Sequence, residues 1–177
     1  LRLSENAPTM SDTALRDWYV NRVVVNRQPL LLLVSSASLL PMIVPASDVR
    51  SLPARLASLV EIRLRRLGLD KSIVDCEIGQ MGTVVIGQTI DRSVLGIMVD
   101  FAQGIPYYLE AERWDETTLA TVEQRLAETP CHAAHRPDRV IFPETKAPEL
   151  LRARWLGSTP LHPPGFRSGV EHDRGQV

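Results

Sequence analysis

The segment of residues 82–101 constrains the fold most, because it joins a strand pattern to a helix pattern through one short polar turn. Residues 84–86 form a β-branched run between two glycines, which is typical of a short strand. Beyond the turn, apolar residues recur at helical spacing and predict a helix at about 93–105. Gly104 and Pro106 are expected to end or kink this helix. The segment therefore predicts a buried strand with a helix packed on it.

Three apolar segments earlier in the chain predict an antiparallel meander. They cover residues 18–25, 30–34 and 39–44, and turns of about four residues separate them. The middle segment is apolar enough to be buried on both faces. Pro41 lies inside the third segment and predicts an edge position or a late start of that strand, because proline has no N–H for the ladder.

Helical periodicity follows these strands and completes the prediction of the fold class. One apolar stripe predicts a helix at 51–67 with Gly68 as its C′ residue, and another predicts a helix at about 115–128. Leu95 widens the apolar stripe of the helix expected between them. We therefore predict an α+β fold, a small antiparallel sheet of three or more strands that three helices cover on one face.

The character of the chain changes after Cys131, where prolines recur and the apolar periodicity thins. We predict one α+β domain over residues 1–131 and a Pro-rich extension over 132–156, with a short helix in it that docks on the domain. A disordered tail is expected over 157–177, because this segment is rich in proline, glycine and charge.

The composition fits a globular chain. Of the 177 residues 44% are hydrophobic, and the formal net charge of −1 excludes an overall field that attracts nucleic acid. The longest apolar run is too short to span a bilayer, so we expect no membrane association. Cys76 and Cys131 form no disulfide framework, which predicts a reducing, cytoplasmic compartment.

An arginine cluster lies in the last turns of the helix expected at 51–67. It consists of Arg63, Arg65 and Arg66. Cations complement the negative end of a helix dipole, so a solvated face is one interpretation. A small patch that faces phosphate is the other.

Several motifs stand out between residues 15 and 131. They are Asp17-Trp18-Tyr19-x-Asn21, the Leu-Leu-x-Val and Leu-Leu-Pro-x-x-x-Pro segments that follow it, Leu126-Ala-Glu-Thr-Pro-Cys131, and the core Ile86-Gly-x-Thr-x-x-Arg-Ser-Val-Leu-Gly-x-Met-x-Asp-Phe101. Together they resemble an uncharacterised bacterial domain family, a domain of unknown function. The resemblance implies no activity, but it directs attention to the Arg-Ser-Val-Leu-Gly core. This chain has Gln88 and Val99 where the family carries a lysine and an asparagine, which weakens any role for a cation or an amide there.

The best candidate site is the polar turn before the helix at 93–105, with the residues Thr89, Asp91, Arg92 and Ser93. A helix that begins near Ser93 directs free N–H groups toward Arg92, and together they form a site for a phosphate or a carboxylate. In the structural alternative, Asp91 caps the helix and Arg92 pairs with a carboxylate such as Asp100 or Glu77.

Three further residues are candidates. Asp100 is expected to be partly buried beside Phe101, where an acid must find a partner or serve in acid–base chemistry. Trp18 and Tyr19 are candidates for stacking on a base or another ligand. Since neighbouring residues of a strand point to opposite faces, we expect at least one of the two in the core.

The sequence gives little support for a metal site or a cofactor site. Cys131, His132 and His135 are a conceivable ligand group, but adjacent residues rarely point to one centre and a fourth ligand is not evident. Neither cysteine has the setting of a catalytic thiol. We therefore expect no metal, no cofactor and no catalytic cysteine.

Two functional hypotheses remain. The first is a non-enzymatic interaction module that binds an unidentified protein or nucleic acid, with a bacterial mobile element or a toxin–antitoxin system as its setting. The second is an enzyme that acts on a phosphorylated or nucleic-acid substrate, with Arg92 and Ser93 holding the anion and Asp100 as acid or base. The enzyme hypothesis requires these three side chains to converge on one open pocket.

Overall fold

The computed structural model describes residues 11–88, 91–109, 116–132 and 139–157. Its main sheet contains three antiparallel strands in the order β1-β2-β3. These are β1 (Trp18–Val25), β2 (Gln28–Ser35) and β3 (Pro41–Pro45). A short pair, β4 (Cys131–His132) and β5 (Val140–Ile141), lies apart from this sheet. The predicted meander and the α+β class are confirmed.

The turns of the meander have local causes. Asn26 and Arg27 form a two-residue hairpin turn with positive φ angles of 47° and 67°, the geometry whose twist matches that of paired strands. Pro41 is the first residue of β3, and β3 is also an edge strand. Pro41 therefore fulfils both alternatives that the sequence predicted: the strand starts late, and it lies at an edge of the sheet.

Five α-helices accompany the sheet in the described residues. They are α1 (Leu52–Arg66), α2 (Lys71–Gln80), α3 (Arg92–Tyr108), α4 (Glu116–Ala127) and α5 (Pro143–Trp155), and the 3₁₀ helix η1 (Ala46–Arg50) precedes α1. Gly68 follows α1 with a φ of 73°, as the C′ prediction requires. Gly104 and Pro106 do not end α3, which continues to Tyr108, so of the two expected effects the ending of the helix is wrong. Among the described residues, no helix combines the length and the apolar character that a bilayer crossing requires.

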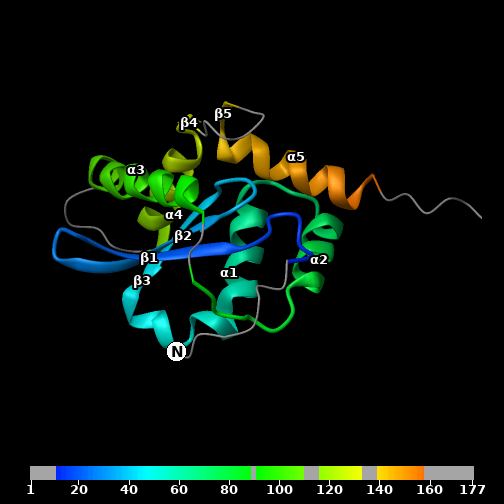
Figure 1. The fold of residues 1–177 in the computed structure, drawn as a ribbon, viewed down its shortest axis with the longest axis horizontal. Helices are drawn as coiled ribbons and strands as arrows, with labels where there is room; N and C mark the ends of the chain where they lie inside the picture. Colours follow the sequence, from blue (N-terminus) through cyan, green and yellow to red (C-terminus); the bar gives the residue numbers. More distant parts are fainter. Residues whose placement is uncertain (1–10, 89–90, 110–115, 133–138, 158–177) are drawn as a thin grey trace, which may run out of the picture.

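Helices cover both faces of the sheet, so the expectation of a single covered face is wrong (Figure 1). α3 and α4 share one core with Leu30, Leu32 and Val34 of β2. α1, α2 and α5 share the other core with Leu31 and Leu33 of the same strand. Because β2 is apolar at every one of these positions, burial requires a helix layer on each side.

The strand expected at residues 84–86 does not form. This segment links α2, on one face of the sheet, to α3, on the other. A chain that crosses from one helix layer to the other does not run along a strand, and Val85 remains 63% exposed. The β-branched run thus serves as an extended connection.

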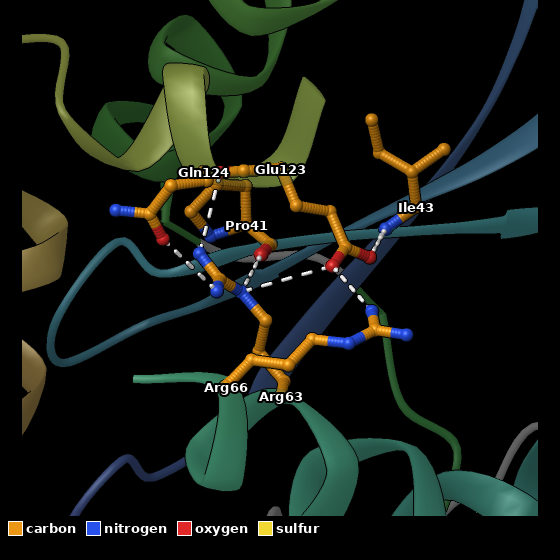
Figure 2. A network of polar contacts seen from close by, with 6 residues as sticks. All are labelled: Pro41, Ile43, Arg63, Arg66, Glu123 and Gln124. Atoms are coloured by element: carbon orange, nitrogen blue, oxygen red, sulfur yellow. Dashed lines mark hydrogen bonds and ion pairs between the residues drawn. The ribbon is translucent and has the colours of Figure 1, made fainter. Parts of the chain in front are cut away.

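A buried polar network closes the outer edge of β3 (Figure 2). Ile43 N donates to Glu123 Oε1 of α4 at 2.8 Å, and Arg63 Nε of α1 donates to Pro41 O at 3.2 Å. Arg63 Nη2 also donates to Glu123 O at 3.3 Å, and Arg66 Nη1 lies 3.4 Å from Glu123 Oε2. Since α1 and α4 lie on opposite faces, the network joins the two helix layers around the edge of the sheet.

The two central charges of this network are almost fully buried. Arg63 is 2% exposed and Glu123 is 5% exposed. Burial lowers the pKa of the Arg63 guanidinium and raises the pKa of the Glu123 carboxyl, while their mutual attraction opposes both shifts. Arg63 therefore belongs neither to a solvated face nor to a patch that faces phosphate, because it is buried and its partners are protein groups. Both interpretations of the arginine cluster are wrong for this residue. Arg65 is exposed and pairs with Glu61 at 2.7 Å, as on a solvated face.

A second buried carboxylate, Glu77 of α2, holds distant segments together. Glu77 is 1% exposed and accepts hydrogen bonds from the backbone N–H groups of Ala14 and Leu15, each at 2.9 Å. The indole Nε1 of Trp155 donates to the same carboxylate at 2.9 Å. With the buried Leu151, this bond docks α5 on the domain.

Candidate functional site

The N-terminus of α3 is capped by its own chain. Asp91 Oδ1 accepts hydrogen bonds from Ser93 N at 2.8 Å and from Val94 N at 3.3 Å. The cap occupies two N–H groups that an outside anion would otherwise bind. Ser93 therefore contributes its N–H to the cap, and Thr89 lies outside the described residues. The anion-binding role of this turn stays a prediction.

Arg92 is the first residue of α3 and its side chain is exposed. The pairing expected with Asp100 or Glu77 is absent from the described part of the chain. Glu77 is instead bound to two backbone N–H groups and to Trp155. Asp100 lies eight residues further along α3, which corresponds to about 12 Å along the helix axis. Arg92 is thus a solvent-facing cation beside a capped helix end.

Asp100 is exposed, so the expectation of partial burial is wrong. It lies at a small pocket of about 90 Å³ between the C-terminal half of α3 and the end of α4. Phe101, Gly104 and Tyr108 also line this pocket, together with Leu126 and residues 129–131. Arg92 and Ser93 do not belong to it. The three side chains of the enzyme hypothesis therefore do not line a common pocket.

Trp18 and Tyr19 point to opposite faces of the sheet. Trp18 packs against the core beneath α1, and Tyr19 packs against the core beneath α3. Both are half-buried. Tyr19 Oη accepts a hydrogen bond from Asp91 N at 3.3 Å, which ties β1 to the start of α3. Their main contacts are with the protein core, and a stacking role for either stays a prediction.

A comparison with known protein families supports the family resemblance. A family model described as a domain of unknown function, DUF6933, matches residues 2–146. The chain belongs to the DUF6933 family. No curated protein and no solved structure was found to match it. The resemblance noted in the sequence is confirmed, and the match extends beyond the motifs into α5.

Among the described residues of this DUF6933 chain, Cys76, Cys131 and His132 do not form a cluster. Cys76 is exposed on α2, and Cys131 is buried with its thiol donating to Thr129 O at 3.6 Å. His132 is exposed, and His135 lies outside the described residues. Within the described ranges, no three residues of the His, Cys, Asp or Glu type lie close enough to hold a metal ion.

The outer face of α3 is a feature that the sequence analysis missed in this DUF6933 domain. Leu95 was assigned to the buried stripe, but it is 38% exposed, and Val99 one turn later is 51% exposed. Tyr107 is 87% exposed. Over its 17 residues the helix carries only two charged side chains, Arg92 and Asp100. The signal in the sequence was the shortage of charge, because Asp100 is the one charged residue of the 93–105 pattern and a solvated helix face normally carries several.

Proposed function

We propose that this DUF6933 protein is a non-enzymatic interaction module that binds another protein through the outer face of α3. The observation that carries the proposal is the exposure of Leu95, Val99 and Tyr107 on a helix whose opposite side fills the core. Tyr107 lies two helical turns beyond Val99, and the exposed Gln103 lies between them. Exposed apolar side chains gathered on one side of an element commonly mark a protein-binding site.

The residue types of this face match those of protein interfaces. Interface centres are depleted in charged residues and enriched in tyrosine, whose large ring loses little conformational freedom on binding. Leu95 and Val99 are one helical turn apart and therefore lie side by side. Tyr107, near the C-terminal end of α3, adds an aromatic anchor at the far end of the face.

Charge favours a protein partner over nucleic acid. Arg92 is the single cation of α3, and the net charge of the whole chain is −1. Nucleic-acid binding by proteins depends on several cations that neutralise successive phosphates. The enzyme alternative loses support because Arg92 and Asp100 do not line one pocket. We place the module in a bacterial cytoplasm, since Cys76 is an exposed free thiol, and keep a mobile element or toxin–antitoxin system as its proposed setting.

Site-specific photo-crosslinking tests the proposal while the partner is still unidentified. A benzophenone amino acid is placed at Val99 in cells of the species that encodes the chain, and at the exposed Ser58 of α1 as a control position. We expect a discrete protein adduct from Val99 only. Leu95→Asp should abolish the adduct, because it places a charge in the apolar contact.

The matched control is Ile62→Asp, which makes the same change at an exposed apolar residue of α1 that is 47% exposed. This variant should retain the adduct. Equal adducts from Val99 and Ser58, or none from either, would refute binding through α3. An adduct that nuclease removes would identify a nucleic-acid partner and refute the protein-binding proposal.

A further inference from the structure

In the part of the chain that the structure describes, β1 is an edge strand whose outer side is unpaired. Asn26 and Arg27 form the hairpin turn, so Val25 and Gln28 make the first hydrogen-bonded pair of the ladder. Hydrogen-bonded positions alternate along an antiparallel pair. The backbone N–H and C=O groups of Val20, Arg22 and Val24 therefore point away from β2.

These outward groups are accessible. Val20 is 43% exposed, Val24 is 62% exposed, and Arg22 between them is exposed as well. In the described part of the chain, β1 makes backbone hydrogen bonds with β2 and with no other segment. The backbone N–H and C=O groups of these three alternate residues thus remain free on an accessible edge.

The opposite edge of the same sheet shows the contrast. There, the outward N–H of Ile43 and the outward C=O of Pro41 are bound by Glu123 and Arg63 (Figure 2). Native proteins usually cover or block a sheet edge, because an open edge templates the addition of another strand. Among the described residues, this protein closes one edge with buried charged side chains. At the other edge, Asp91 N contacts Tyr19 Oη, and the outward groups from Val20 to Val24 stay exposed.

We propose that the open edge of β1 receives an extended, acidic segment of a partner protein as a fourth strand. Strand addition satisfies the outward backbone groups, and the alternate side chains select the sequence. Val20, Arg22 and Val24 share one face of the sheet, so the added strand presents an apolar, an acidic and an apolar residue opposite them. This site lies on β1 and is separate from the outer face of α3.

Charge selects an acidic partner over a second copy of the chain. Residues 16–35 carry Arg16, Arg22 and Arg27 against a single acid, Asp17, and all four are exposed. Two copies paired antiparallel about Arg22 would place these guanidinium groups directly opposite each other. A register shifted by two residues, which places Arg22 opposite Val24 of the other copy, keeps the two Arg22 side chains diagonal neighbours at about 7–8 Å, so repulsion remains.

Synthetic peptides of defined sequence test the proposal. The probe is Thr-Val-Thr-Glu-Thr-Val-Thr, which presents its acid opposite Arg22 in either strand direction, and the control has lysine in place of glutamate. Binding is measured by the shifts of backbone amide NMR signals. We expect saturable binding of the glutamate peptide with a Kd on the order of 1 mM, perturbations centred on β1, and at least tenfold weaker binding of the lysine peptide.

Two variants separate backbone pairing from charge. Val20→Pro removes an outward N–H that the β1–β2 ladder does not use, so the domain should still fold. This variant should no longer bind the glutamate peptide, whereas the control Val20→Ala should still bind it. Arg22→Glu keeps the backbone intact and should reverse the preference toward the lysine peptide. Val99→Asp, which disrupts the proposed α3 interface, should leave peptide binding unchanged and so distinguishes the two proposals.

Three results would overturn the inference. The first is absence of saturable binding by the glutamate peptide. The second is equal binding of the two peptides, both by the wild-type protein and by the Arg22→Glu variant. The third is a wild-type chain that sediments as a dimer and becomes monomeric in Val20→Pro, because the edge would then belong to a second copy.

Discussion

The substitution Arg63→Met should destabilise the domain strongly, because it removes the buried cation beside the Glu123 carboxylate. Glu123 then keeps only the more exposed Arg66, whose Nη1 lies 3.4 Å from Glu123 Oε2. Methionine retains most of the volume of the buried side chain, so no large cavity forms. Arg63 donates hydrogen bonds to Pro41 O, Glu123 O and Gln124 Oε1, and Glu123 beside it is 5% exposed. Removing one member of a buried pair typically costs about 3–5 kcal/mol.

The charged part of this cost has an upper limit, because Glu123 escapes an unpaired charge by taking up a proton. Protonation at pH 7 of a carboxyl whose ordinary pKa is about 4.5 costs about 3.4 kcal/mol, at about 1.4 kcal/mol per pH unit. The lost hydrogen bonds add about 1–2 kcal/mol. We therefore expect Arg63→Met to lower the free energy of unfolding by about 3–5 kcal/mol at pH 7, and the limit on the charged part sets the upper end of this range.

The destabilisation should depend on pH, because Arg63→Met raises the folded-state pKa of Glu123 further above its unfolded value. Stabilisation from a raised carboxyl pKa is present at low pH and is lost as the pH rises through the folded-state value. At pH 5 protonation costs only about 0.7 kcal/mol, so the mutant should then be destabilised by about 2–3 kcal/mol.

Urea denaturation at pH 7 and pH 5, followed by circular dichroism, measures both quantities. The matched control is Arg65→Met on the same helix, because Arg65 forms an exposed pair with Glu61. It should change stability by about 0–1 kcal/mol at both pH values. A loss below about 1 kcal/mol for Arg63→Met, or a loss that does not diminish at pH 5, would refute the assignment of a buried pair.

Two further substitutions test the interior and the surface of α3. Phe101→Ala should cost about 3–5 kcal/mol of unfolding free energy, because Phe101 is 2% exposed between helix and sheet, and Val99→Ala on the same helix is its near-neutral control. A loss below about 1 kcal/mol in urea denaturation would show that the face of α3 is misassigned. Arg92→Ala should leave stability within about 0.5 kcal/mol, since its side chain is exposed. Breaking a buried ion pair costs about 3–5 kcal/mol, so a loss of about 3 kcal/mol or more would show that Arg92 has a buried carboxylate partner.

The sequence alone determined the elements whose signals are local. Turn chemistry and alternating apolar residues indicated β1, β2 and β3, and the helical stripe that ends at Gly68 indicated α1. Capping of α3 by Asp91 could also be predicted from the sequence, because the side chain binds N–H groups only two and three residues ahead. Each of these interactions joins residues within about one helical turn or one tight turn.

Tertiary packing decided where local signals were ambiguous. The β-branched run at 84–86 has the composition of a strand, yet it became the link between the helix layers. Pro106 costs a helix interior about 3 kcal/mol, but α3 continues past it because Ile105 and Leu109 are buried. Gly104 allows this packing, since a Cβ there would lie 3.2 Å from Leu126 Cδ2.

Only the tertiary structure decided which polar residues pair. Arg63 lies on the apolar stripe of α1, and Glu123 lies between Leu119 and Leu126 on the stripe of α4, so both showed a local sign of burial. Nothing within either helix indicated that they meet around the edge of β3, because 60 residues separate them. Local propensity is set by neighbours in the chain, whereas a buried charge takes its partner from whichever element the folded core brings into contact.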